Sequence, residues 1–396
     1  MDYCVGYCTN VHAGADLAAT IANLRRHALA VKQRVCPDAP LGVGLWLSAE
    51  AARQLLASRG VSELASWLSE SGLVPFTLNG FPYGDFHQPV VKYDVYRPTW
   101  YDQARVEHTA DLIEILDGLL PVGMAGSIST LPLAWGTPAA TAQQLALAAA
   151  NLRQVAAHLA RLEQERGRRI RVCLEPEPGC ALQRCDDVIR FFAQHLVAAG
   201  DEQLTRRYLG VCHDVCHAAV MFEDQAEVLE RYRAAGIGIG KVQVSSAVVV
   251  PWDQIAIRDR AAALAQLRHF AEDRYLHQTM AGGGLDAVRR FFDDLPQALT
   301  VSPAPEQLAG QWRIHFHVPV YLARFGWLET SQPQIRECLE ATVRHPELQH
   351  FEVETYAWSV LPAELRRPEL ADGIAAELTW FHAQLAGTRQ AGLGSL

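Results

Sequence analysis

Long hydrophobic runs are missing from this sequence. Hydrophobic residues make up 49% of its 396 residues, yet apolar segments such as VQVSSAVVVP fall well below the roughly 18 residues that a membrane span needs. The N-terminal segment MDYCVGYCTN has neither the basic region nor the apolar core of a signal peptide. We therefore expect a cytoplasmic protein with no membrane span.

Charge is also sparse, and it is not basic. Charged residues make up only 20% of the chain, with 35 Lys and Arg against 44 Asp and Glu and a formal net charge of -9. This combination of low charge and high apolar content excludes a disordered chain. The acidic balance argues against a dedicated nucleic-acid binder, which usually carries a basic surplus.

Several common catalytic and binding motifs are absent. The glycine-rich segments AGGGL and GIGIGK lack the flanking residues of a P-loop or a dinucleotide site, and no G-x-S-x-G nucleophile elbow occurs. The nine cysteines are odd in number in a long chain, so we expect no disulfide framework. The segment CHDVCH has no second ligand pair at zinc-finger spacing, so we expect Cys212 to pack as a small hydrophobic side chain.

The sequence does contain a repeated alternation of short apolar segments with longer amphipathic ones. Strands that alternate with helices in this way form parallel β-sheets, and about eight repeats favour a closed (β/α)8 barrel over an open sheet. We predict strands at 5–7, 41–48, 74–80, 121–130, 169–175, 207–214, 237–245, 313–320 and 349–356, and helices at 14–35, 49–71, 99–118, 138–166, 185–199, 223–235, 333–344 and 363–386.

Nine strand candidates are one more than a barrel needs, so one of them is expected to lie outside it. The stretch 246–310 is too long for a single βα loop, and we expect it to form an inserted helical segment. Residues 1–390 are predicted to form a single barrel domain with that insertion, and residues 391–396 to form a frayed tail.

Polar side chains mark the ends of the predicted strands. In a (β/α)8 barrel the catalytic groups lie at the carboxyl ends of the strands. Here those ends carry residues that can bind metals or form hydrogen bonds: His12, Asn79, His87, Glu175, Glu177, His213, Asp214, His217, Gln243, His315, His317, Glu352 and Glu354. We therefore predict a functional site at the barrel mouth.

Three of these carboxylates would conflict at one mouth without a cation. Glu175, Asp214 and Glu354 would repel one another there, because buried carboxylates are costly unless they are paired or bound to metal. Carboxylates together with imidazole suit Mn²⁺, Mg²⁺, Fe²⁺, Co²⁺ or Zn²⁺. The pattern therefore predicts a divalent metal site whose metal the sequence does not identify.

Several of these residues also have a structural alternative. Asp214 suits the N-cap of the following helix, and His12 suits a packed position. Glu175 could form a rigid strand exit, because proline restricts the residue before it. The sequence leaves open whether Glu175 or Glu177 faces the mouth, and we expect Glu175 because it ends the strand before Pro176.

The order of these motifs resembles that of the xylose-isomerase-like TIM barrels. The matching residues are Glu175 in CLEP, Asp214 and His217 in DVCH, and Glu354 in VETY. That superfamily contains sugar isomerases, ketose 3-epimerases, cyclitol enzymes and metal-dependent AP endonucleases. The resemblance implies a TIM barrel that performs metal-dependent chemistry.

A closer likeness covers nearly the whole chain. The segments GYCTNVHAG, LGVGLWLS, TLNGFPYGDFH, LEPEPGC, DVCHAAV, HFHVPVY and VETYAW look like those of the metabolite traffic family (EboE) of the ebo gene cluster. That cluster is implicated in moving or maturing a secondary metabolite, and other members resemble a prenyltransferase and a sugar-phosphate cyclase. The resemblance implies a cyclitol or polyol ketone as the substrate.

One predicted ligand departs from the sugar-epimerase pattern. Those enzymes place a histidine where this chain has Gln243, which is a neutral and weaker ligand. His315 and His317 share one face of their predicted strand, and that face points either to the mouth or outward. One of these two histidines could supply the missing imidazole.

The main hypothesis is a divalent-metal-dependent isomerase or epimerase acting on an α-hydroxy ketone. Glu175 and Glu354 would act as paired acid and base, with His217 as a third catalytic residue. The predicted metal ligands are Glu175, Asp214, Gln243, His317 and Glu354. The predicted substrate-binding residues are His12, Asn79, His87, Trp135, His315 and Arg313, the last of these for a phosphate. The loop FPYGDFH at 81–87 is predicted to form a lid.

Two other functions stay open. The same mouth with two or three metals could hydrolyse a phosphoester, using more of the rim histidines. A barrel without catalysis could instead bind or hand on a metabolite, which fits the family label. In each case we expect a small-molecule polyol partner and no nucleic acid. Related barrels often dimerise or tetramerise, which leaves a homo-oligomer open.

Overall fold

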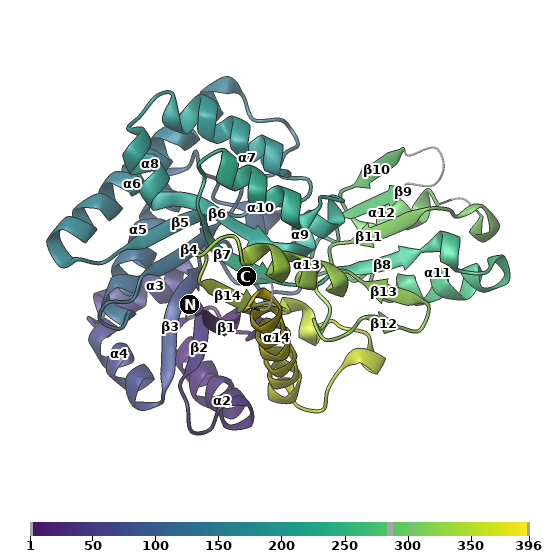
Figure 1. The fold of residues 1–396 in the computed structure, drawn as a ribbon, viewed down its shortest axis with the longest axis horizontal. Coiled ribbons are helices and arrows are strands. Elements are labelled where there is room, and N and C mark those ends of the chain that lie inside the picture. Colours follow the sequence, from purple (N-terminus) through teal and green to yellow (C-terminus); the bar gives the residue numbers. More distant parts are fainter. Residues whose placement is uncertain (1–2, 283–287, 303, 394–396) are drawn as a thin grey trace.

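Eight parallel strands form a closed barrel in the structure, a computed structural model that describes residues 3–282, 288–302 and 304–393. The strand order around the barrel is β1-β14-β7-β6-β5-β4-β3-β2 (Figure 1). The strands are β1 (Cys4–Cys8), β2 (Leu41–Trp46), β3 (Leu73–Asn79), β4 (Gly126–Thr130), β5 (Ile170–Leu174), β6 (Leu209–Asp214), β7 (Ile239–Val244) and β14 (His350–Val353). The predicted (β/α)8 barrel is confirmed.

Helices cover the outside of the barrel (Figure 1). They are α1 (Leu17–Asn23), α2 (Leu29–Val35), α3 (Ala49–Ala57), α4 (Val61–Glu70), α5 (Gln103–Leu119), α6 (Ala142–Arg166), α7 (Cys185–Phe191), α8 (Glu202–Tyr208), α9 (Val215–Val220), α10 (Gln225–Ala234), α13 (Gln332–Thr342) and α14 (Leu370–Leu393). The tail predicted to fray at 391–396 is helical to Leu393, and residues 394–396 lie outside the described residues.

A second sheet lies beside the barrel (Figure 1) and is formed by the part of the chain that follows β7 and precedes α13. Its strands are antiparallel, in the order β10-β9-β11-β8-β13-β12. They are β8 (Val248–Pro251), β9 (Thr279–Gly282), β10 (Arg289–Phe292), β11 (Gln311–Ile314), β12 (Arg324–Phe325) and β13 (Leu328–Thr330), accompanied by helices α11 (Arg260–Arg268) and α12 (Leu295–Thr300). We call residues 248–330 the insertion.

The insertion corrects one expectation from the sequence. A mainly helical segment was predicted at 246–310, but the segment is built on a sheet and extends to β13. Its strands have two to four residues each, too few to show the alternating pattern of a strand. The predicted strand at 313–320 overlaps β11 and lies outside the barrel, where one of the nine strand candidates was expected to lie.

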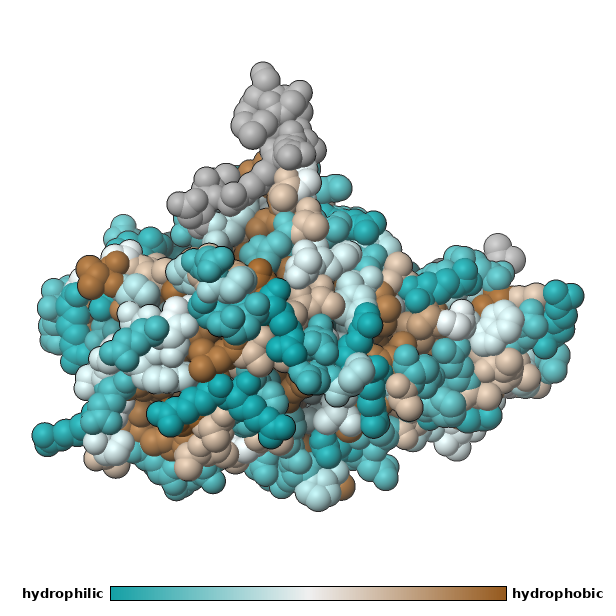
Figure 2. All heavy atoms as spheres, turned by 90° about the horizontal axis from the view of Figure 1, so that it is seen from below, coloured by the Kyte–Doolittle hydropathy of each residue, from teal (hydrophilic) through white to brown (hydrophobic). Residues whose placement is uncertain are grey.

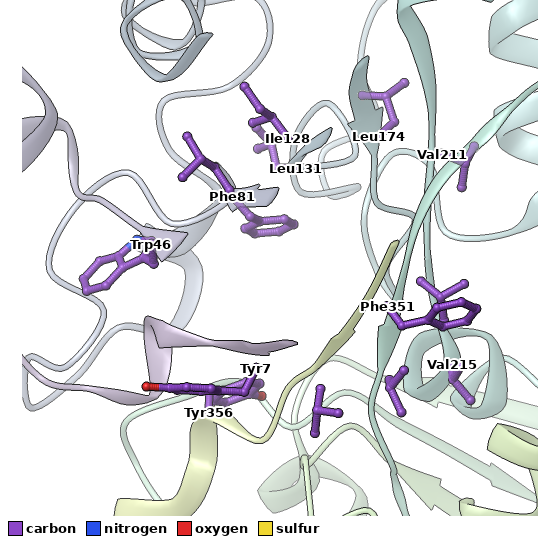
Figure 3. Close-up of a cluster of buried hydrophobic side chains, with 14 of the residues drawn as sticks. Tyr7, Trp46, Phe81, Ile128, Leu131, Leu174, Val211, Val215, Phe351 and Tyr356 are labelled. Carbon is purple, nitrogen blue, oxygen red and sulfur yellow. The ribbon is translucent and has the colours of Figure 1, made fainter. Parts of the chain in front are cut away.

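One continuous hydrophobic core joins the strands and helices. Figure 3 shows buried side chains from different barrel strands, among them Tyr7 on β1, Ile128 on β4, Val211 on β6 and Phe351 on β14. Hydrophilic residues cover much of the face seen in Figure 2, with hydrophobic residues in smaller groups. Among the helices of the described residues, none is long and apolar enough to cross a membrane.

An ion pair lies inside the barrel. Lys241 on β7 and Glu352 on β14 are both fully buried, and the ammonium group donates a hydrogen bond to the carboxylate. Gly44 on β2 leaves room for this pair, because a Cβ atom at that position would lie 1.4 Å from Glu352 Oε1. Glycine is therefore required here by a close side-chain approach and not by a turn.

The substitution Gly44→Ala is expected to lower the free energy of unfolding by about 3 kcal/mol. The added methyl group must displace the Glu352 carboxylate from its buried partner. Urea denaturation followed by circular dichroism measures the loss. Gly387→Ala on α14 is the matched control, since a Cβ there meets no atom within 4 Å and alanine favours a helix. Equal midpoints for the two variants would contradict the role assigned to Gly44.

Candidate active site

A small pocket opens at the carboxyl ends of the barrel strands. Its volume is about 60 Å³, which is room for roughly four to six water molecules. The pocket is lined by Asn10, Asn79, Phe81, Pro82, Phe86, Val91, Lys92, Val95, Tyr96, Glu175, Glu177, His217, Tyr275, Leu276, His315, His317, Glu354 and Tyr356. The sequence left open which of Glu175 and Glu177 faces the mouth, and both of them do. The same holds for His315 and His317.

Three carboxylates meet beside this pocket: Glu175 and Glu354 line it, and Asp214 lies against them. Glu175 follows β5, Asp214 ends β6 and Glu354 follows β14. One oxygen of each lies within 4.8 Å of an oxygen of the other two, and the three residues are 4%, 2% and 4% exposed. Burial raises the pKa of all three carboxyls, and repulsion between them raises the pKa of Glu175 and of Glu354 further. The arrangement favours either protons or a cation.

Hydrogen bonds hold the Glu354 carboxylate in place. Its Oε1 accepts from Asn10 Nδ2 at 2.6 Å and from Asn79 Nδ2 at 3.0 Å. The next residue, Thr355, donates from Oγ1 to the buried Glu377 on α14 at 2.5 Å. The first strand, the third strand and the C-terminal helix thus all contribute to the position of one carboxylate.

The Asp214 carboxylate uses one of its two oxygens to cap a helix. Its Oδ1 caps helix α9 by accepting from the His217 amide at 2.8 Å, and it accepts from the Ser245 hydroxyl at 2.7 Å. The capping alternative for Asp214 is therefore correct. Its other oxygen, Oδ2, is buried with no hydrogen bond to any described residue, so the cap leaves one oxygen for a ligand.

Two buried histidines of the pocket lining are in direct contact. Their Nε2 atoms, in His217 and His315, are 3.2 Å apart. His217 Nδ1 lies 2.9 Å from the Pro176 carbonyl, and His315 Nδ1 lies 2.8 Å from Gln278 Oε1. Because both Nδ1 atoms face acceptors, each neutral ring carries its hydrogen there and presents an Nε2 lone pair to the other. A shared proton or a cation would relieve this contact.

A third histidine completes the cluster. His317 Nδ1 lies 3.0 Å from the Glu354 carbonyl, and its Nε2 lies 4.0 Å from Asp214 Oδ2 and has no hydrogen-bond partner among the described residues. Three residues further along the chain, the Val320 amide donates to Glu377 at 3.1 Å. The same buried glutamate therefore anchors the segments that follow His317 and Glu354.

These unpartnered atoms fit a divalent metal. Glu175 Oε2, Asp214 Oδ2 and His317 Nε2 are buried without a hydrogen bond in the described part of the chain. Asp214 belongs to two groups of side chains whose ligand atoms are close enough to hold one ion. The first group also contains Glu175 and Glu354, and the second also contains His217 and His317. Carboxylate and imidazole are the donors that Mn²⁺, Fe²⁺, Co²⁺ and Zn²⁺ accept in proteins. The residues present therefore suit the predicted ion.

Gln243 lies on the strand between those of Asp214 and Glu352, and its role as a metal ligand remains a prediction. It lies on β7, in register with Asp214 on β6 and Glu352 on β14. The side chain is fully buried, and its Oε1 makes no hydrogen bond within the described residues. His317 brings an imidazole to within 4.0 Å of Asp214, the residue in register with Gln243.

Two of the six predicted substrate-binding residues, Asn79 and His315, line the pocket. His12 does not. Its Nε2 lies 3.1 Å from the Tyr7 hydroxyl, and its ring stacks on that of His27 with 4.6 Å between ring centroids. These contacts match the packed position that was the alternative for His12.

His87, Trp135 and Arg313 do not line the pocket either. His87 Nε2 lies 2.6 Å from the carbonyl oxygen of Asn10 and so supports the turn after β1. Trp135 borders a separate surface cavity. The Arg313 guanidinium lies 3.9 Å from the centroid of the Phe222 ring, outside the pocket.

Among the polar side chains that sequence analysis missed are Asn10, Lys92 and Tyr96, which line the pocket, and Gln278, which bonds to the lining residues Glu177 and His315. Asn10 precedes His12 at the same strand end, so the strand-end rule could have found it. Lys92 and Tyr96 lie in the long loop after β3, and Gln278 lies in the insertion. No strand end marks these three positions, and only the folded chain brings them to the mouth.

Comparison with known proteins supports the fold. A xylose isomerase-like TIM-barrel protein from Mycobacterium smegmatis, in complex with magnesium, is 10% identical with a TM-score of 0.54, over 98% of this chain and 97% of its own. A xylose isomerase domain protein from Alicyclobacillus acidocaldarius is 11% identical with a TM-score of 0.46, over 97% and 99%. A probable 3-DHS dehydratase, AsbF from Bacillus anthracis, is 13% identical with a TM-score of 0.45, over 96% and 98%.

Sequence comparison gives no closer relationship. No protein-family model and no curated protein matches the chain, so the resemblance to the ebo metabolite traffic family stays a prediction. The closed barrel with its surrounding helices agrees in architecture with the Mycobacterium smegmatis structure. The chain therefore has the fold of the xylose-isomerase-like TIM barrels.

Proposed function

We propose that this protein is a divalent-metal-dependent isomerase or epimerase that acts on an α-hydroxy ketone by proton transfer. The observation that carries the proposal is the meeting of Glu175, Asp214 and Glu354 beside one pocket, with the unpartnered Nε2 of His317 next to them. Binding alone does not need two carboxylates beside a ligand, whereas moving a proton between two faces of a carbon does.

The metal would be held by the carboxylates of Glu175, Asp214 and Glu354 and the imidazole of His317, with Gln243 beside them. A bound Mn²⁺, Mg²⁺, Co²⁺, Fe²⁺ or Zn²⁺ would supply Lewis acidity toward the carbonyl and hydroxyl oxygens of the ketone.

Glu175 and Glu354 would act as the acid and the base. Glu354 is fixed through Oε1 by the amides of Asn10 and Asn79, which leaves Oε2 for a substrate proton. Glu175 Oε2 has no hydrogen bond in the described chain. One carboxylate would remove the proton from the hydroxyl-bearing carbon, and the other would return a proton to the opposite face, which epimerises that carbon. A single carboxylate serving both carbons would give aldose–ketose isomerisation.

The loop after β3 would exclude water from this chemistry. Lys92 in this loop pairs with Asp294 of the insertion at 2.6 Å, and the Tyr275 hydroxyl donates to the Phe86 carbonyl at 3.1 Å. These contacts tie the loop to the insertion above the mouth and support the lid predicted at 81–87. Water exclusion strengthens electrostatic interactions with the reacting oxygens.

A second candidate is phosphoester hydrolysis. This function is favoured by His217 and His317, because they could hold a second ion together with Asp214. Two adjacent ions can stabilise the attacking oxygen and the leaving oxygen of the displacement at phosphorus. A third reading, suggested by the ebo resemblance, is a barrel that binds a polyol or cyclitol metabolite in secondary metabolism without converting it.

Metal content is the first test. Protein purified without chelator is expected to contain about one divalent ion per chain, and the double variant Glu175→Ala/Glu354→Ala is expected to lose it, as measured by elemental analysis. About two ions per chain would favour the hydrolase. No bound metal after supply of Mn²⁺, Co²⁺ and Zn²⁺ would contradict the catalytic proposal.

The metal-free protein is expected to lose stability as the pH rises from about 4 to 8. The raised pKa of Glu354 means that the folded state retains a proton that the unfolded state has released, so the unfolding free energy falls through this range. Glu354→Gln removes the group that binds this proton. It is expected to reduce the fall in unfolding free energy between pH 5 and pH 8 by about 3 kcal/mol. Urea denaturation at pH 5 and pH 8 measures it. Added divalent metal should restore stability at pH 8, and an unchanged slope in the variant would contradict the assignment.

Proton transfer itself can be detected by solvent exchange. Metal-loaded protein is expected to incorporate deuterium from D₂O into the hydroxyl-bearing carbon of an α-hydroxy ketone, as measured by proton NMR. Glu175→Gln and Glu354→Gln are each expected to slow exchange at least about 100-fold. Glu163→Gln, which alters a carboxylate paired with Arg207 on the outside of the barrel, should not. Equal rates in all three variants would exclude the two glutamates as acid and base.

A further inference from the structure

We infer that the substrate joins a polar hydroxy-ketone end to an unphosphorylated alkyl or aryl body. This inference rests on the proposed function and names the substrate class of the same site. It follows from how few polar atoms of the pocket are left for a ligand and from where those atoms lie.

The free polar atoms are concentrated at the metal-binding end of the pocket. Glu175 Oε2, His317 Nε2 and Asn10 Oδ1 are buried and make no hydrogen bond within the described residues, and neither does Asp214 Oδ2 beside the pocket. All four belong to residues at the barrel mouth. A substrate that ends in adjacent carbonyl and hydroxyl oxygens would place its polar atoms at this end.

Most polar groups on the pocket walls are already paired. Glu177 Oε1 accepts from the Tyr96 hydroxyl at 2.7 Å and from Gln278 Nε2 at 2.8 Å. The Tyr275 hydroxyl donates to a backbone carbonyl of the lid at 3.1 Å. Among the wall tyrosines of the described chain, only Tyr356 has a hydroxyl with no hydrogen bond. The walls therefore offer little to a chain of hydroxyl groups.

The rest of the wall is apolar: Phe81, Pro82, Phe86, Val91, Val95 and Leu276. Phe86 packs against Tyr275 and Tyr356, with 5.0 Å and 5.3 Å between ring centroids. A hydroxyl placed against this surface would lose its hydrogen bonds to water and gain none. An alkyl or aryl group would instead gain from burial.

The described residues that line the pocket offer no free cation for a phosphate. Lys92 is the one lysine or arginine among these residues, and its ammonium group already pairs with Asp294 at 2.6 Å. Arg313, for which the sequence suggested a phosphate role, packs on the Phe222 ring outside the pocket. Phosphate sites usually present Arg, Lys or several backbone amides. An uncharged body fits the pocket better.

Solvent-deuterium exchange with small probe ketones tests the inference. The pocket volume of about 60 Å³ calls for small probes. We would compare acetoin and 2-hydroxyacetophenone with dihydroxyacetone, fructose and dihydroxyacetone phosphate on metal-loaded protein. The alkyl and aryl ketones are expected to show a kcat/KM at least about tenfold higher, since a single hydrophobic group can discriminate by this much. Faster exchange of fructose or of the phosphate ester would overturn the inference.

A pair of matched variants tests whether the wall sets this preference. Val95→Thr puts a hydroxyl on the apolar wall with little change of shape, and it should lower the ratio of aryl ketone to dihydroxyacetone exchange at least about threefold. Val35→Thr on α2 makes the same change outside the pocket and should leave the ratio unaltered. An unchanged ratio in Val95→Thr would show that the wall does not contact the substrate body.

Calorimetric binding separates this inference from the proposed function. If no ketone exchanges but 2-hydroxyacetophenone binds metal-loaded protein at least about tenfold more tightly than fructose, the substrate class stands and the isomerase proposal fails. If fructose or dihydroxyacetone phosphate binds as tightly as the aryl ketone, the substrate class fails even when exchange is observed.

Discussion

Negative charge buried at the barrel mouth is the constraint on which the rest of this structure depends. Glu175, Asp214 and Glu354 are buried and place ligand oxygens within 4.8 Å of one another. The buried ammonium group of Lys241 lowers the pKa of all three, but it already pairs with Glu352. The mouth is therefore short of positive charge, and protons or a cation must supply it.

The insertion contributes what the barrel strands do not. β7 ends near Gln243, which brings an amide where an imidazole would be the stronger ligand. His315 and His317 reach the same place from the insertion, directly after β11. Gln278, also in the insertion, orients the first of these rings at 2.8 Å and pairs with Glu177 of the barrel. The site is thus assembled from two sheets of different architecture.

The barrel and its carboxylates could be predicted because their signals are local. Glu175 and Glu354 follow apolar strand segments, and the barrel geometry brings all strand ends together. The insertion could not be predicted, since its short strands pair across long gaps in sequence. His315 and His317 were expected to lie together on a strand, but β11 ends at Ile314. Both histidines follow the strand, and both line the pocket.

The division of the site between two sheets has an evolutionary consequence. The carboxylates belong to the barrel, whereas the imidazoles of His315 and His317 and the wall residues Tyr275 and Leu276 belong to the insertion. Mutation or exchange of the insertion would change these imidazoles and the apolar wall while the barrel kept its three carboxylates. Such proteins can therefore vary the lining of the pocket through one segment, with the barrel left intact.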